Sequence, residues 1–141
     1  MAFVQERVIE WGDCDAAGIV FYPNYFRWID GCFHAMCRAS GFDQMTMMKD
    51  HGLVGTPLIE SGLKFRAPGR YHDVLTVTAR ISRLGRSGLT VDYRLAIGER
   101  LVAEGQEVRA VAAEVEGKMR AVPMPEAIRA ALQPWCGTHD G

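Results

Sequence analysis

Two aspartates, Asp13 and Asp15, occur in the segment WGDCDAAGIVFYPNY (residues 11–25), directly before the apolar run 19–21. A carboxylate is costly to bury, so an acidic residue beside an apolar run needs a partner or a function. Facing an activated carbonyl group, a carboxylate can attack it or deprotonate a water molecule that does so. The segment is therefore either a hydrolytic site or a turn that contains acidic residues.

The start of the following helix supplies a second reactive group. Pro23 suits the first helical turn and disfavours the α conformation at Tyr22, which places Tyr22 at or near the N-cap. The Tyr22 N–H then has no partner within the helix and can stabilise negative charge on a carbonyl oxygen. Gly18 lets the chain fold back toward this amide. From the residues alone, Asp15 is either the catalytic carboxylate or a capping residue.

Periodicity predicts the helices that must position these groups. A long helix runs from Pro23 to about Ser40, where Gly41 supplies a stop. Its broad apolar face is predicted to carry Tyr22, Tyr25, Phe26, Ile29, Cys32, Phe33, Met36 and Cys37. A short second helix is predicted over residues 43–51, and a final helix after Pro125.

Alternation of period two predicts the strands, which cover residues 3–11, 59–66, 75–82 and 89–97 and one long stretch from about 101 to 115. Gly105 is expected to mark a β-bulge, because the apolar alternation is lost there. The intervening turns are too short for crossovers, so neighbouring strands should be antiparallel. The predicted fold class is α+β, with an antiparallel sheet of about five strands wrapped around the long helix in a single domain over residues 1–141.

The composition is that of an ordinary globular protein. Hydrophobic residues make up 48% and charged residues 23% of the 141 residues, and the formal net charge of -1 gives no field for nucleic acid. No apolar run approaches the ~20 residues that a membrane span needs, so no membrane partner is expected. No signal peptide is evident, and the cysteines lack CxxC spacing. We therefore expect reduced thiols and a cytoplasmic protein.

Several common sites are missing from the sequence. There is no G-x-S-x-G, no P-loop and no G-x-G-x-x-G motif. The four histidines, at positions 34, 51, 72 and 139, are too scattered for a zinc motif. The residues after Asp15 supply no further side-chain oxygens for calcium. We expect neither a metal nor a cofactor.

The motif Gly12-Asp13-x-Asp15-x-x-Gly18-Ile19-Val20-x-Tyr22-Pro23-x-Tyr25 resembles the signature of the 4-hydroxybenzoyl-CoA thioesterase family, which has the hotdog fold. The resemblance continues through residues 27–30 and 52–57 and more loosely to about Val122. It implies hydrolysis of an acyl-CoA thioester, with Asp15 as nucleophile or general base and the Tyr22 amide as oxyanion donor. Gly18 and Ile19 are assigned to substrate binding with them.

The resemblance also concerns the acyl group and the CoA phosphates. In the cell-envelope branch of the family a histidine stands at the position of Pro23, so the aromatic-acyl branch is the closer match. Asp30 is either the first residue of the wet helix face or, with Thr56, an acceptor for a hydroxyl of the acyl group. Arg86 and Ser87 are expected to grip a CoA phosphate, although the turn is less basic than in the aromatic-acyl branch. The alternative for Arg86 is a solvated hairpin tip.

The open edges of a single sheet usually require a cover. Hotdog proteins pair two sheets edge to edge with their sites at the junction, so the resemblance implies at least a dimer, and we expect a homotetramer. Two other functions remain open: a CoA-ester hydratase or dehydratase, for which His34 is the only nearby histidine, and a non-catalytic acyl-CoA-binding protein.

Overall fold

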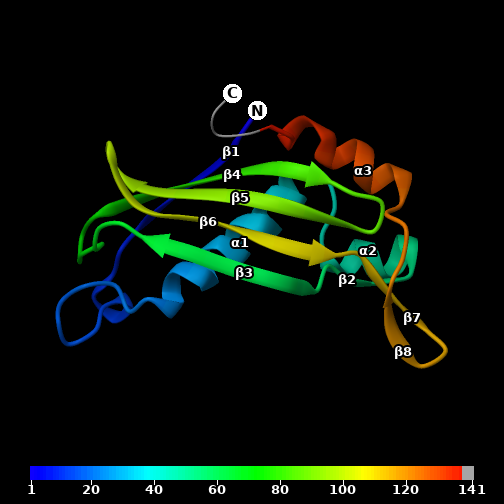
Figure 1. The fold of residues 1–141 in the computed structure, drawn as a ribbon, viewed down its shortest axis with the longest axis horizontal. Helices are drawn as coiled ribbons and strands as arrows, with labels where there is room; N and C mark the ends of the chain where they lie inside the picture. The colour runs from blue at the N-terminus through cyan, green and yellow to red at the C-terminus, as the bar shows by residue number, and fades with distance from the viewer. Residues whose placement is uncertain (138–141) are drawn as a thin grey trace.

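A long helix, α1 (Pro23–Ala39), lies against one face of an antiparallel sheet in the computed structural model, which describes residues 1–137 (Figure 1). The sheet has five strands in the order β1-β4-β5-β6-β3. Their bounds are Phe3–Val8 (β1), Leu58–Phe65 (β3), Val74–Leu84 (β4), Gly88–Ile97 (β5) and Arg100–Ala110 (β6). The α+β architecture predicted from the sequence, a five-stranded antiparallel sheet packed on one long helix, is confirmed.

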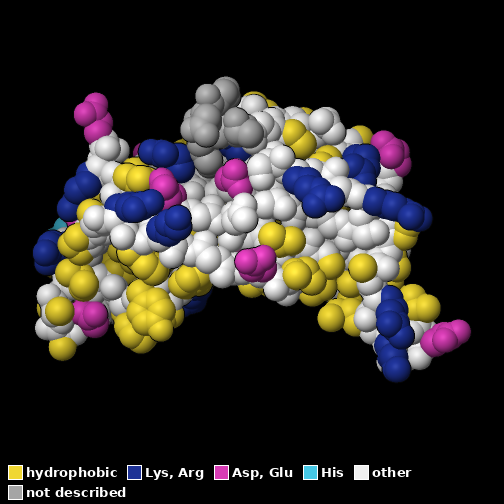
Figure 2. All heavy atoms as spheres, in the orientation of Figure 1, with side chains coloured by type: hydrophobic (Ala, Val, Ile, Leu, Met, Phe, Trp, Pro, Cys, Tyr) yellow, Lys and Arg dark blue, Asp and Glu magenta, His cyan; other side chains and the backbone are white. Residues whose placement is uncertain are grey.

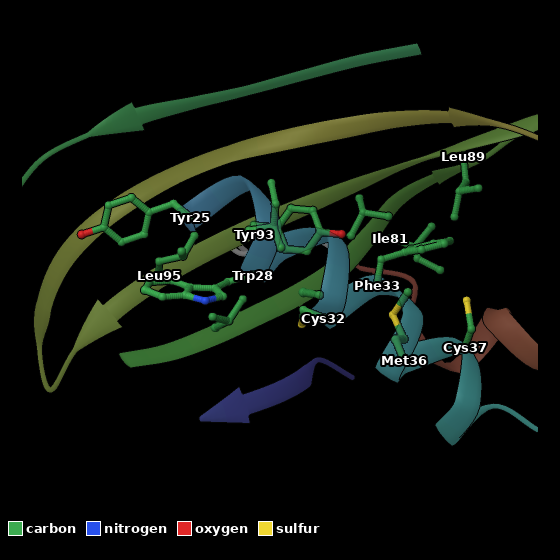
Figure 3. Close-up of a cluster of buried hydrophobic side chains, with 14 of the residues drawn as sticks. Tyr25, Trp28, Cys32, Phe33, Met36, Cys37, Ile81, Leu89, Tyr93 and Leu95 are labelled. Atoms are coloured by element: carbon green, nitrogen blue, oxygen red, sulfur yellow. The ribbon is translucent and has the colours of Figure 1, made fainter. Parts of the chain in front are cut away.

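The apolar face of α1 forms the core with the inner face of the sheet. Figure 3 shows this cluster, in which the side chains from α1 point toward those of Ile81, Leu89, Tyr93 and Leu95. The interior is dry enough that burial raises the pKa of the Cys32 and Cys37 thiols to about 12. Two residues differ from the predicted face, because Trp28 is buried and the Tyr22 side chain is 59% exposed.

A second, smaller sheet was not predicted. It contains β2 (Leu53–Gly55), β7 (Ala112–Val115) and β8 (Lys118–Ala121). The predicted single strand over 101–115 is therefore wrong, since the chain leaves the large sheet after β6 and pairs with β2. Val111 lies between β6 and β7, where the chain passes from the large sheet to the small one, and its amide donates to the Ser87 carbonyl over 2.8 Å.

The remaining elements follow the sequence closely. The helices α2 (Gln44–His51) and α3 (Glu126–Leu132) were both predicted. The predicted first strand is too long, because β1 ends at Val8 and residues Trp11–Asp13 form a 3₁₀ turn. This turn is closed by the Asp13 carboxylate, which accepts a hydrogen bond of 2.8 Å from the Glu10 amide.

Gly105 does not form the predicted bulge. Its register with both Leu63 and Tyr93 is regular, and the shifts in β6 pairing fall elsewhere. A Cβ at this position would overlap with the carbonyl oxygen of Gly62 on the neighbouring strand. Glycine is therefore required by the close approach of two backbones.

We expect Gly105→Ala to lower the free energy of unfolding by about 2 kcal/mol or more, because strand backbones must move to admit the methyl group. Urea denaturation measures the change, and amide exchange should show the loss concentrated in β3. Gly62→Ala is the matched control, since a Cβ at Gly62 meets nothing within 4 Å. Equal stability of the two variants would contradict the interpretation.

Candidate active site

The segment that carries Asp15 is a tight loop closed by an isolated antiparallel bridge between Cys14 and Val20. The Asp15 amide donates to the Ile19 carbonyl over 2.9 Å, and the Gly18 amide donates to the Asp15 carbonyl over 3.0 Å. Gly18 has a φ of 78°, which a residue with a side chain rarely adopts. The glycine predicted to reverse the chain does so in the structure.

Hydrogen bonds fix this loop to the start of α1 and to the segment before β4. The Asp13 carbonyl accepts from the Phe21 amide and from Asn24 Nδ2, each over 2.9 Å. On the other side, the Val20 amide donates to the Gly69 carbonyl over 2.9 Å. The loop is therefore held at the N-terminal end of the long helix, as its proposed chemistry requires.

The Asp15 carboxylate does not cap α1. Its Oδ1 accepts a hydrogen bond of 2.9 Å from the Ala17 amide within the loop, and the side chain is otherwise exposed in the single chain. The helix has no side-chain cap, so the capping interpretation of Asp15 is wrong. Within residues 1–137, Oδ2 of this carboxylate has no hydrogen-bond donor, which leaves it open to a ligand.

Tyr22 is the N-cap of α1, but its conformation differs from the prediction. Its φ of -55° and ψ of -32° are helical, although a following proline disfavours this region. A turn begun one residue earlier compensates, because the Asn24 amide donates to the Phe21 carbonyl over 3.0 Å. In the part of the chain that the structure describes, the Tyr22 amide donates to no acceptor.

Asp30 and Thr56 are joined by a residue that the sequence analysis missed. Arg109 of β6 donates from Nη2 to Asp30 Oδ1 over 2.7 Å and from Nη1 to the Thr56 carbonyl over 3.1 Å. The Arg109 side chain is 4% exposed, whereas that of Asp30 is 54% exposed. The buried guanidinium of Arg109 thus binds one oxygen of the Asp30 carboxylate, and the rest of the Asp30 side chain is exposed.

The guanidinium of Arg109 is itself held from behind. Glu107 accepts from Arg109 Nε over 3.2 Å and from Nη2 over 3.1 Å, and Tyr93 donates to Glu107 Oε1 over 2.7 Å. Burial and the Glu107 charge raise the pKa of Tyr93, so its hydroxyl stays protonated. Burial alone would lower the pKa of Arg109, but Glu107 and Asp30 raise it. The sequence does contain a signal for this cluster. Glu107 and Arg109 are two residues apart on a strand, so they lie on the same face, and both are charged where apolar residues are expected.

Arg86 and Ser87 lie in the turn between β4 and β5. Arg129 of α3 fixes this turn by donating to the Leu84 carbonyl over 3.3 Å and to the Gly85 carbonyl over 2.6 Å. The turn borders a hollow of about 330 Å³ whose lining includes Arg83, Arg86, Ser87 and Arg109. A larger hollow of about 710 Å³, on the outer face of β3, β5 and β6, contains none of the predicted site residues.

The predicted site residues form two groups at opposite ends of β3. The loop group (Asp15, Gly18, Ile19 and Tyr22) adjoins its last residue, because the Tyr22 and Phe65 rings are 6.3 Å apart. The far group (Asp30, Thr56, Arg86 and Ser87) adjoins its first residue, because Arg109 pairs with Leu58 and with Leu89 after the turn. The two ends of this 8-residue strand are about 25 Å apart, and along α1 Asp30 lies about 12 Å from Tyr22. One chain does not bring the two groups together.

Neither a metal centre nor a membrane helix is found in residues 1–137. No group of three or more His, Cys, Asp or Glu side chains there is arranged to hold a metal ion. No helix in this range has the length and apolar character that a membrane span needs.

Known proteins resemble this chain over most of its length. The model of the thioesterase superfamily matches residues 17–104. The chain is 32% identical to 4-hydroxybenzoyl-CoA thioesterase of Pseudomonas sp. strain CBS-3, over 86% of this chain and 90% of that protein. It is 30% identical to 1,4-dihydroxy-2-naphthoyl-CoA hydrolase of Synechococcus elongatus, with 91% and 93% covered.

A solved structure shares the fold. A mutant of 4-hydroxybenzoyl-CoA thioesterase in complex with 4-hydroxybenzoyl-CoA superposes with a TM-score of 0.85 at 28% identity, over 93% of this chain and 98% of that one. The chain therefore belongs to the thioesterase superfamily, and its fold is that of the hotdog thioesterases. Within that class it is an acyl-CoA thioesterase, a hydrolase of thioesters.

Proposed function

We propose that this thioesterase hydrolyses an aromatic acyl-CoA of the 4-hydroxybenzoyl type, whose ring carries a hydroxyl group. The observation that carries the proposal is the pairing of Asp30 and Thr56 by Arg109, with the Asp30 carboxylate half exposed. A site that accepts a hydrogen bond from a substrate hydroxyl discriminates strongly against analogues that lack it. Two relatives are named for acyl groups with ring hydroxyls, 4-hydroxybenzoyl and 1,4-dihydroxy-2-naphthoyl, which supports the same substrate class.

Asp15 and Tyr22 are the proposed catalytic groups. The Tyr22 N–H donates to the thioester oxygen as negative charge develops on it. Asp15 either attacks the carbonyl carbon, giving an anhydride that water cleaves, or removes a proton from the attacking water. In both routes the C–S bond breaks, CoA leaves as the thiol and the acyl group becomes a free acid. The unused Oδ2 of Asp15 and the unused Tyr22 amide support these roles.

We propose that the site is completed in a dimer. The free edge of β3 carries exposed Leu58, Ile59 and Phe65, and Figure 2 shows hydrophobic side chains gathered along this lower margin. A two-fold axis perpendicular to the sheet would pair β3 with the partner's β3 antiparallel. The loop group of one chain would then adjoin the far group of the other. Further pairing of such dimers would give the expected tetramer.

Asp15→Asn should lower turnover of 4-hydroxybenzoyl-CoA by about 10²-fold or more, because an amide can neither attack the carbonyl nor accept the proton. Release of the CoA thiol measures it. Asp13→Asn is the matched control two residues away, and its amide oxygen can still accept from the Glu10 amide. Undiminished release by Asp15→Asn would remove Asp15 from its role, and substrate binding without release by the native protein would favour a non-catalytic acyl-CoA-binding function.

The native enzyme should prefer 4-hydroxybenzoyl-CoA to benzoyl-CoA by at least about 10-fold in kcat/KM, the effect of one hydrogen bond to a charged acceptor. Asp30→Asn should reduce this preference while leaving benzoyl-CoA turnover nearly unchanged. Equal specificity constants for the two substrates in the native enzyme would refute the hydroxyl preference.

The mass in solution should be at least twice the 15.6 kDa of one chain when measured by light scattering. Ile59→Glu, at a position 65% exposed on β3, should lower both the mass and the turnover, because charges would be buried across the new edge. Val4→Glu, at a position 54% exposed on the opposite edge strand β1, should change neither. A monomer with full activity would exclude the shared site.

A further inference from the structure

The buried cluster of Arg109, Glu107 and Tyr93 has no role in the thioester chemistry described above. A buried ion pair is weak evidence for a role in stability, because well-packed apolar residues of similar volume often stabilise a fold as well or better. Here two carboxylates, Glu107 and Asp30, share one guanidinium, which leaves an excess of negative charge. His34 Nε2 lies 3.6 Å from Asp30 Oδ1, at the outer end of this cluster.

The geometry of the guanidinium sets the orientation of two groups at once. Its two terminal nitrogens reach Asp30 Oδ1 and the Thr56 carbonyl, and its Nε is held by Glu107. The ring of Phe33 lies 4.2 Å from the guanidinium carbon and closes its apolar face. Each hydrogen-bonding edge of Arg109 is therefore committed to a defined partner.

Two oxygens beside this cluster have no donor or acceptor. Within residues 1–137, Asp30 Oδ2 accepts no hydrogen bond, and Thr56 Oγ1 is buried without any partner. Buried polar atoms are nearly always paired, so an unpaired hydroxyl beside a fixed carboxylate indicates a place for a polar group of a ligand. A lysine in place of Arg109 would supply the charge, but it lacks the planar fork that aligns Asp30 with Thr56.

We propose that Arg109 is a positioning residue for substrate specificity, and this rests on the proposed function. It holds the Asp30 carboxylate and Thr56 so that their free oxygens meet the hydroxyl at the far end of the aromatic acyl group. The hydroxyl donates to Asp30 Oδ2, and Thr56 Oγ1 donates to the hydroxyl oxygen. Glu107 and Tyr93 act indirectly: Glu107 accepts hydrogen bonds from the Arg109 guanidinium, and Tyr93 donates a hydrogen bond to Glu107.

The test compares kcat/KM for 4-hydroxybenzoyl-CoA with that for benzoyl-CoA in the native enzyme and in Arg109→Lys. The ratio should fall by about 10-fold in Arg109→Lys, because a hydrogen bond to a charged group is misaligned, while benzoyl-CoA stays within about 3-fold of native. Arg94→Lys is the matched control, since Arg94 lies on β5 with an exposed side chain. It should leave the ratio unchanged.

A second variant keeps the test decisive if Arg109→Lys does not fold. Glu107→Gln keeps the shape and the acceptor for Tyr93 but weakens the anchor of Arg109, and it should also lower the ratio. A native ratio in either folded variant, or an equal loss on both substrates, would overturn the positioning role while leaving the proposed function intact. If the native enzyme hydrolyses neither substrate, the proposed function fails first, and equal native constants would remove the hydroxyl preference on which this inference depends.

Discussion

Burial of one face of α1 against the inner face of the sheet is the interaction on which the rest of the structure depends. The helix enters the core at Tyr25 and stays in it to Cys37, so its axis is fixed relative to every strand. Its first turn is thereby placed at the Phe65 end of β3, and Asp30, two turns further on, is placed beside Arg109. The packing of α1 on the sheet therefore sets the positions of both the Tyr22 amide and the Asp30 carboxylate.

The same apolar interior sets the electrostatics of the charges that enter it. Water is excluded from Cys32 and Tyr93, and burial raises the pKa of both groups. In such surroundings a charge needs a partner with good geometry, which Arg109 finds in Glu107 and Asp30. The members of the polar cluster are therefore joined by hydrogen bonds, and the cluster ends at the protein surface in the Asp30 carboxylate.

The free edge of β3 links the fold to assembly. Its two ends carry different halves of the predicted site, one at Phe65 and the other beside Leu58. Gly105 lets β6 and β3 approach closely, and the two strands pair in regular register around it. An edge strand exposes unpaired backbone N–H and C=O groups, which can pair with another chain. Pairing with a second copy of this chain would satisfy these groups and cover the exposed edge.

The sequence by itself determined the elements and their faces. Pro23 and Gly41 bounded the long helix, period-two alternation located β3, β4 and β5, and the loop motif singled out Asp15, Gly18 and Tyr22. These signals are local, because helix caps, turns and side-chain alternation depend on residues a few positions apart. That locality also explains why the sequence alone predicts the α+β class.

Only the tertiary structure decided which distant residues meet. The pairing of Arg109 with Asp30 joins residues 79 positions apart, and no spacing rule announces it. The same holds for the overlap that excludes a side chain at Gly105 and for the departure of β7 to a second sheet. The helical conformation of Tyr22 was also not predicted, because a following proline disfavours it. The hydrogen bond from the Asn24 amide to the Phe21 carbonyl, which closes a turn there, is a feature of the folded structure. Contacts of this kind arise when independently formed elements pack, so their partners are fixed by three-dimensional geometry rather than by a pattern along the chain.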